Sequence, residues 1–365
     1  MSRAYRAAVE CIARWTGERL RRRFPHNPQI FICNASAGTR HRHRTVRAVA
    51  RSRCGGGRAG GVAGAGGAAG AGNVRSSSRN GSAGTTDRAP PELWWTGSGE
   101  EARERVAARL ADGDAREPVI VSLGGDGTHN HILQAGIDLG GYGIFLRLPL
   151  GSGNDAAGVE SLEQALDDLE GIMTPRWIAA VRVGTPQWYR FAFNIASVGL
   201  DAYVTLLHNR WRGVLPGNTY RLLVDLAVLR YDRALRVGPL ALRGTTFAGE
   251  SVDLGSTSRS LVAMGVSGNL TYGDHMRVLP GAENVCVIER AGLLEKLRMK
   301  RLFYEGRHTE ESITALYSLK ELTGEYSGTL PLQYDGEARF LRAEDFPLTM
   351  EVISSAVRVL APDRV

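Results

Sequence analysis

The sequence predicts two domains, an α/β domain with a parallel sheet followed by a β-sandwich. At 365 residues, with 43% hydrophobic and 23% charged residues, the chain is long enough to form two cores. In its first half, short apolar runs end in glycine loops and lead into helices, which is the pattern of parallel α/β units. After about residue 176, strand-like runs alternate with Gly, Pro and Asn turns, which is typical of an all-β domain.

The clearest unit of the first domain is the segment 122–136, SLGGDGTHNHILQAG. An apolar run typical of a buried parallel strand precedes it, and a helix capped by Thr128 is predicted to follow. Glycines at such a junction let backbone N–H groups approach a phosphate at the helix start. The carboxylate of Asp126 would repel that phosphate unless a divalent cation lay between them. The alternative is a structural Asp126-Gly127 hairpin turn, which the lack of an alternating strand after it disfavours.

Two further strand-to-loop junctions have the same character, at 34–38 and 151–155. Loops that leave the carboxyl ends of parallel strands line one crevice. We therefore expect the loops 34–38, 124–128 and 151–155 to converge on one site.

Four regions are predicted along the chain. A basic N-terminal helix occupies residues 1–28, the α/β domain 29–157, and the β-sandwich 158–365, leaving open that the last strand returns to the first domain. Residues 54–90 are rich in Gly, Ala and Ser and are predicted to be a disordered insertion, because they have no large apolar side chains to bury.

Charge and cysteine usage limit the function classes. The net charge of +7 favours anionic partners, but the basic run 40–53 lacks the aromatic residues of a nucleic-acid stacking surface. The helix expected within residues 1–24 either lies on an anionic membrane surface or packs on its own domain. Four cysteines without C-x-x-C spacing indicate reduced thiols and a cytoplasmic protein. No apolar stretch is long enough for a transmembrane helix, and no secretory signal is expected.

Five motifs occur in a fixed order: NASAG, GGDGT, PLGSGND, ASVGLDAYV and YDGEA. With them the chain resembles the diacylglycerol kinase catalytic family, which contains bacterial lipid kinases, sphingosine kinases and ceramide kinases. The resemblance runs from about Gln29 to the C-terminus, apart from the insertion. It implies a Rossmann-like nucleotide-binding domain of the NAD kinase and diacylglycerol kinase type, a β-sandwich domain that takes the lipid, and a cleft between them.

The resemblance also implies roles for individual residues. Asp126 would act through Mg²⁺, and Asp335 and Glu337 of YDGEA would supply the base that takes the proton from the lipid hydroxyl. A plain hairpin turn is the alternative for Asp335-Gly336. The residues expected around ATP are Asn34, Ala35, Ser36, Ala37, Gly38, Thr96, Gly124, Gly125, Asp126, Gly127, Thr128, Asn130, Gly151, Ser152, Gly153 and Asn154.

Three positions depart from the family pattern. His131 stands where an acidic residue is usual, and Ser152 stands where threonine is common. The acidic-glycine pair that relatives often carry is missing after the segment 279–292, which puts a second, structural Mg²⁺ in doubt.

The expected function is ATP-dependent phosphorylation of diacylglycerol or a related lipid, as in phospholipid biosynthesis. An NAD kinase-like enzyme and a catalytically impaired nucleotide-binding regulator are the alternatives. The expected partners are ATP and a lipid substrate at a membrane surface, without nucleic acid, and a homodimer is left open. A cytoplasmic location is expected, with peripheral attachment to the inner face of the membrane left open.

Overall fold

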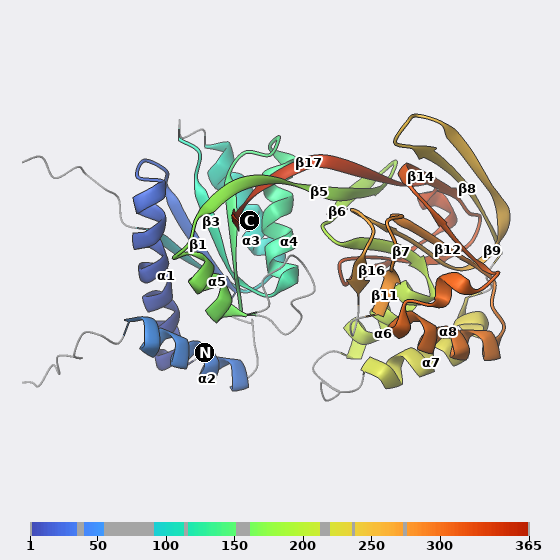
Figure 1. Cartoon of the computed structure of the whole chain (residues 1–365), viewed down its shortest axis with the longest axis horizontal. Helices are drawn as coiled ribbons and strands as arrows, with labels where there is room; N and C mark the ends of the chain where they lie inside the picture. Colours follow the sequence, from blue (N-terminus) through green and yellow to red (C-terminus); the bar gives the residue numbers. More distant parts are fainter. Residues whose placement is uncertain are drawn as a thin grey trace, which may run out of the picture.

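A computed structural model describes most of the chain. The described residues are 2–34, 40–54, 91–112, 116–150, 161–211, 220–235, 238–272 and 276–363. Apart from Cys54, the predicted disordered insertion 54–90 lies outside them, as do the loop residues 35–38 and 151–155. Figure 1 shows two domains side by side, joined by two long strands.

The first domain is a parallel sheet with helices on both faces, as predicted. The strand order is β2-β1-β3-β4, and every pair is parallel. Its strands are β1 (Gln29–Asn34), β2 (Glu92–Thr96), β3 (Val119–Gly124) and β4 (Ile144–Pro149). Its helices are α1 (Arg3–Arg23), α2 (Arg40–Cys54), α3 (Gly99–Ala111), α4 (Asp126–Asp138) and α5 (Leu162–Asp168).

Two separate cores cover the two faces of this sheet. One joins side chains of α1, α2 and α5 to the strands, and the other joins α3 and α4 to them. Because β3 is buried along its whole length, its apolar run has no alternation, which is the pattern of a strand covered on both faces.

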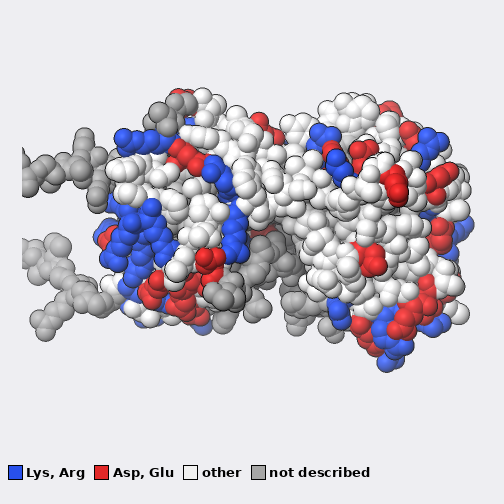
Figure 2. Space-filling model, turned by 45° about the horizontal axis from the view of Figure 1, so that its top comes forward, with Lys and Arg blue, Asp and Glu red and all other residues white. Residues whose placement is uncertain are grey.

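Helix α1 packs on its own domain, which decides between the two alternatives for residues 1–24. Tyr5, Val9 and Ile12 are each at most 1% exposed in the core beneath α1, so its apolar face is not available to a membrane. Lys and Arg side chains gather on the outer side of this domain (Figure 2).

The expectation of reduced thiols is wrong for two of the four cysteines. Helices α1 and α2 lie side by side, which brings the Cα atoms of Cys11 and Cys54 to 6.5 Å, and the two sulfurs form a disulfide. The two cysteines are 43 positions apart in the sequence, which carries no local sign of this pairing. Cys33 and Cys286 are free and buried.

The second domain is a two-layered, strand-rich body, as predicted. Strand β9 pairs with β8 through its first half and with β7 and β12 through its second half, so it passes from one layer to the other. A core between the layers takes side chains from both. Its strands are β5 (Met173–Thr185), β6 (Trp188–Ala192), β7 (Ile195–Gly199), β8 (Pro239–Thr246), β9 (Ser251–Gly265), β10 (Leu270–Tyr272), β11 (Met276–Leu279), β12 (Val285–Glu289), β13 (Thr314–Tyr317), β14 (Leu319–Glu325), β15 (Leu330–Tyr334), β16 (Glu337–Leu341) and β17 (Leu348–Pro362).

Three helices cover one side of this domain (Figure 1). They are α6 (Leu200–Trp211), α7 (Tyr220–Ala234) and α8 (Leu293–Glu305). The residues of α6 and α8 lie among strand-like runs, so the all-β pattern of this part of the sequence did not indicate them. Among the described residues, no helix is both long enough and apolar enough to cross a bilayer.

Strands β5 and β17 connect the domains. They pair antiparallel from Thr349 opposite Gly184 to Pro362 opposite Met173. The end of β17 also pairs with β4 in parallel, with Arg358 opposite Ile144. The last strand therefore returns to the sheet of the first domain. The turn of the β15–β16 hairpin meets α4 through a hydrogen bond from Asn130 to Asp335, and the candidate site lies there.

Candidate active site

The predicted strand, glycine loop and helix are present, with one correction at the helix start. Strand β3 ends at Gly124, Gly125 is the N-cap, and α4 begins at Asp126. Thr128 is therefore not the cap but a buried residue of the first helical turn. The hairpin alternative for Asp126-Gly127 is wrong. The first turn of α4 directs backbone N–H groups toward the loop, which favours a bound anion.

Two more of the expected nucleotide residues lie beside this loop. Asn34, at the end of β1, donates a hydrogen bond from Nδ2 to Oγ1 of Thr128 over 2.8 Å. Thr96, at the end of β2, is the register partner of Asn34. It is 2% exposed, and its hydroxyl has no hydrogen-bond partner among the described residues. Adjacent parallel strands thus bring these three polar side chains to one edge of the sheet.

The remaining expected nucleotide residues cannot be placed. Ala35, Ser36, Ala37, Gly38, Gly151, Ser152, Gly153 and Asn154 lie outside the described residues.

A buried arginine stands next to the carboxylate of the glycine loop. Arg147 lies on β4 opposite Ser122 of β3, its side chain is 6% exposed, and it forms an ion pair with Asp126. His129 lies against the same arginine and is joined through Nδ1 to Oγ of Ser122 over 2.7 Å. Burial, with the charge of Arg147, lowers the pKa of His129 to about 3, so this histidine is neutral at physiological pH.

These residues do not by themselves form a magnesium site. In the part of the chain that the structure describes, no three His, Cys, Asp or Glu side chains are grouped to hold a metal. The carboxylate of Asp126 is already paired with a guanidinium, which competes with coordination of a hard cation.

Asp335 lies in a hairpin turn. The alternative of a plain hairpin turn at Asp335-Gly336 is therefore correct for the backbone conformation. The turn joins β15 to β16, and both residues have positive φ, 48° at Asp335 and 88° at Gly336. Asparagine, aspartate and glycine tolerate this conformation better than other residues.

The carboxylate of Asp335 nevertheless has a specific environment. It accepts hydrogen bonds from the backbone N–H groups of Phe193, Asn194 and Ile195 and from Nδ2 of Asn130 over 3.0 Å. Burial raises its pKa to about 6, although the three amides favour the ionised form. With four donors around it, this carboxylate holds α4 of the first domain against the turn between β6 and β7 of the second.

Glu337 presents its carboxylate to the glycine loop. The residue is exposed, and its Oε1 lies 3.8 Å from the point where a Cβ on Gly127 would stand. The turn that carries it is held from α6 by a hydrogen bond of 2.8 Å from Nδ2 of Asn209 to the carbonyl of Gly336. Of the two acids of YDGEA, Glu337 is therefore the one open to a substrate.

His131 does not face the loop. Its Nδ1 lies 3.1 Å from Oε2 of Glu100, which begins α3 alongside α4. The histidine that departs from the family pattern therefore takes part in a contact between α3 and α4.

Sequence reasoning did not single out the half-buried acid Asp201, although the motif ASVGLDAYV contains it. Asp201, in the first turn of α6, accepts hydrogen bonds from Oγ of Ser197 over 2.7 Å and from Nε2 of Gln333 over 3.2 Å. Burial raises its pKa to about 6. Gln333 lies on β15 two residues before Asp335, so Asp201 is connected to the strand that carries the candidate catalytic turn.

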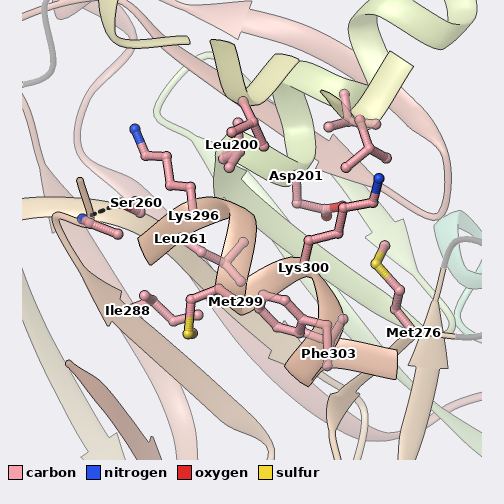
Figure 3. Close-up of a pocket in the computed structure, with 15 residues that line it drawn as sticks. Leu200, Asp201, Ser260, Leu261, Met276, Ile288, Lys296, Met299, Lys300 and Phe303 are labelled. Carbon is pink, nitrogen blue, oxygen red and sulfur yellow. Dashed lines mark hydrogen bonds between the residues drawn. The ribbon is translucent and has the colours of Figure 1, made fainter. Parts of the chain in front are cut away.

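Asp201 is also part of the wall of a predominantly apolar pocket (Figure 3). The pocket lies between helices α6, α7 and α8 and the strands β9, β11 and β12. Lys296 and Lys300 of α8 also line it, with their amino groups directed to different sides in Figure 3. The apolar side chains that line it include Val224, Val228, Leu261, Met276, Met299 and Phe303.

Comparison with known proteins agrees with this architecture. Residues 88–185 match the family model of the diacylglycerol kinase catalytic domain, whereas no curated protein matches the sequence.

Three solved structures from Bacillus anthracis str. Sterne have the same fold. One, a diacylglycerol kinase, is 12% identical with a TM-score of 0.53, over 92% of this chain and 97% of its own. A putative diacylglycerol kinase is 13% identical with a TM-score of 0.57, over 93% and 99%. A third, also a putative diacylglycerol kinase, is 13% identical with a TM-score of 0.56, over 91% and 96%. At these identities the likeness concerns the fold alone. The segment 88–185 is therefore similar to the diacylglycerol kinase catalytic domain, and the chain as a whole shares its fold with these bacterial structures.

Proposed function

We propose that this protein is an ATP-dependent lipid kinase, which transfers the γ-phosphate of ATP to a hydroxyl of diacylglycerol or a related lipid. One observation carries the proposal. An apolar pocket in the second domain has a half-buried acid, Asp201, on its wall, and Gln333 connects that acid to the strand ending at the Asp335 turn. A long acyl chain suits such a pocket, because its burial is favourable and needs no polar partner.

The first domain supplies the phosphate side of the proposed site. The amino end of α4 would hold the phosphates of ATP, with Asn34, Thr96 and Thr128 around them. The ion pair of Arg147 with Asp126 reduces the repulsion that a bare carboxylate would exert on phosphate. Mg²⁺ remains the proposed companion of the nucleotide, and it would depend mainly on the phosphate oxygens for its ligands.

Glu337 is the proposed general base. Its carboxylate would take the proton from the lipid hydroxyl while that oxygen bonds to the γ-phosphorus, and the bond from the γ-phosphorus to the bridging oxygen of ADP would break. Asp335 is a positioning residue in this scheme, because its carboxylate is occupied by the four donors that fix the turn.

A catalytically impaired nucleotide-binding regulator is the second candidate. The observation that favours it is the ion pair at Asp126, since a kinase that needs this carboxylate for Mg²⁺ would be weakened by it.

A panel of acceptors tests the proposal. The full chain is incubated with γ-labelled Mg-ATP and, in turn, diacylglycerol, phosphatidylglycerol, sphingosine, ceramide and NAD. We expect label in a lipid product. Label in NAD alone would support the NAD kinase-like alternative, and ATP binding without turnover on any acceptor would support the regulator.

A further inference from the structure

Exposed leucines are concentrated on two neighbouring helices of the second domain. Among the described residues, five of the twelve exposed large hydrophobic side chains lie on α7 and α8. Scattered exposed leucines need no explanation, but a cluster indicates a surface that binds something. The five, which we call the α7–α8 face, are Leu222 at 63% exposed, Leu229 at 54%, Leu293 at 47%, Leu294 at 81% and Leu297 at 42%.

Helix α7 has two apolar sides with different environments. Val224 and Val228 point inward and line the pocket. Leu222 and Leu229 are seven residues apart, which places them on one face of the helix, and that face is exposed. A helix with a single buried stripe would carry polar residues on that outer face.

Two ion pairs hold α8 alongside α7. Nζ of Lys296 lies 2.6 Å from Asp232, and Nζ of Lys300 lies 2.6 Å from Asp225. The two aspartates are seven residues apart, so they share the side of α7 that faces α8. The helices therefore form one layer over the pocket (Figure 1).

The outer face of α8 continues the apolar surface of α7. Met299 and Phe303 point inward to the pocket, whereas Leu293, Leu294 and Leu297 are exposed. Because Lys296 and Lys300 fix which side of α8 meets α7, Leu293 and Leu297 lie toward the outer junction of the helices. The five leucines thus belong to one surface.

Basic side chains surround this surface. Arg233 follows Leu229 by four residues, and Arg298 follows Leu294 by four, so each arginine lies on the same helical face as its leucine. Both arginines are exposed, as are Arg230, Arg290 and Arg301. Of these five, Arg298 and Arg301 are paired with Glu311 and Glu305, so the positive charge of the rim rests on Arg230, Arg233 and Arg290. The acids nearest the α7–α8 junction, Asp225 and Asp232, are neutralised by the two lysines. A leucine surface with an arginine rim is complementary to lipid with anionic headgroups.

We propose that the α7–α8 face docks on a bilayer surface that contains anionic phospholipid. This proposal rests on the proposed lipid kinase activity, since the inward side chains of the same two helices line the apolar pocket that would hold the acyl chain. Docking there would bring the pocket to the membrane that contains the acceptor. Neither helix needs to enter the bilayer deeper than its outer side chains.

Sedimentation with vesicles tests the docking surface. The full chain is mixed with vesicles of phosphatidylcholine alone, or of equal parts phosphatidylcholine and phosphatidylglycerol, and the bound fraction is measured. We expect binding to the anionic vesicles, weaker binding to phosphatidylcholine, and loss of binding at high salt. The double variant Leu222→Asp with Leu294→Asp should bind the anionic vesicles at least about tenfold more weakly.

Phe247→Asp is the matched control. Phe247 is 57% exposed but lies at the turn between β8 and β9, away from α7 and α8 (Figure 1), so this variant should bind as the wild type does. Melting temperatures of both variants, compared with the wild type, exclude loss of folding as the cause. If the leucine variant binds anionic vesicles as tightly as the wild type, the proposal is wrong.

A kinase assay separates failure of the docking surface from failure of the proposed function. On a short-chain diacylglycerol dispersed as monomers, the leucine variant should keep near-wild-type turnover, whereas on vesicles it should lose most of it. If the wild type binds vesicles through this face but phosphorylates no lipid, the docking surface is supported and the proposed kinase activity is rejected. A wild-type dimer that the leucine variant dissociates, without vesicle binding, would instead make the face an interface between two copies.

Discussion

Arg147 and Asp126 form an ion pair at the carboxyl edge of the first domain's sheet, where β4 lies next to β3. The arginine is nearly enclosed, so its charge is weakly screened by solvent. It is a fixed cation beside a loop that is suited to phosphate. In this chain the carboxylate of the glycine loop is therefore compensated by a guanidinium before any metal arrives.

The first prediction concerns ATP binding without metal. Arg147→Met should weaken ATP binding in EDTA by about tenfold or more, because the phosphates would then meet the uncompensated carboxylate of Asp126. The loss should be smaller with Mg²⁺ present. Calorimetric titration in both buffers measures the effect. Arg358→Met is a control, since Arg358 forms its ion pair with Glu117 at the other end of β4. Equal metal-free affinity in wild type and Arg147→Met would refute the prediction.

The second prediction separates the two acids of YDGEA. Glu337→Gln should lower turnover by about 10² to 10⁴, the usual contribution of a general base, while ATP affinity and melting temperature stay the same. Asp335→Asn should instead destabilise the fold by about 1 to 3 kcal/mol, because its new amide N–H₂ would face groups that are themselves donors. Turnover and chemical denaturation of both variants provide the comparison. If Asp335→Asn is stable but inactive while Glu337→Gln stays active, Asp335 is the general base and Glu337 is not.

The third prediction is a pH dependence of stability. Burial raises the pKa of Asp201 to about 6 from an ordinary value of 3.8. The folded protein therefore binds a proton more tightly than the unfolded chain, so this residue's contribution to stability is lost as pH rises toward and through 6. Asp201→Asn cannot ionise. Relative to that of the wild type, its free energy of unfolding should therefore increase between about pH 4 and 7, by up to about 3 kcal/mol.

Urea denaturation of wild type and Asp201→Asn across this range measures the difference. His129 and His308 have pKa values lowered by burial, to about 3 and about 4, and they titrate with the opposite sign in both proteins, so they cancel in the comparison. A difference that does not change with pH would mean that Asp201 is ionised throughout.

The fourth prediction concerns the contact between α3 and α4. His131→Glu should place a second carboxylate beside Glu100 and lower stability by up to about 1 kcal/mol, since both side chains are partly exposed and solvent screens their repulsion. Adding Glu100→Gln should restore most of the loss. Melting temperatures of the two single variants and the double variant test this. Additive losses would show that the two residues do not interact.

Local sequence was enough to predict the units of the first domain. The apolar run of β3, the glycines after it and the helix beyond are neighbours in the chain, so their pattern shows them directly. The position of Asn34 beside Thr128 also followed, because parallel strands place their carboxyl ends together. Thr96 was expected there only from the family resemblance.

Contacts between distant segments could not be read in the same way. Arg147 lies inside an apolar run, YGIFLRLPL, and only the pairing of β4 with β3 shows that it meets Asp126. The disulfide depends on the packing of α1 against α2. Asp335 looked like a turn residue, and its turn is real, but the donors to its carboxylate come from the junction between β6 and β7 and from α4.

The central claim is that the pocket beneath α7 and α8 holds the acyl chain of the phosphorylated lipid, and filling it is the most direct test. Val228 lines the pocket and is 4% exposed, so Val228→Phe would occupy the space where the chain should lie. In an assay with γ-labelled ATP and long-chain diacylglycerol, we predict that this variant loses at least about tenfold in kcat/KM for the lipid, with ATP affinity and melting temperature near those of the wild type. A folded Val228→Phe that phosphorylates diacylglycerol as efficiently as the wild type would contradict the account.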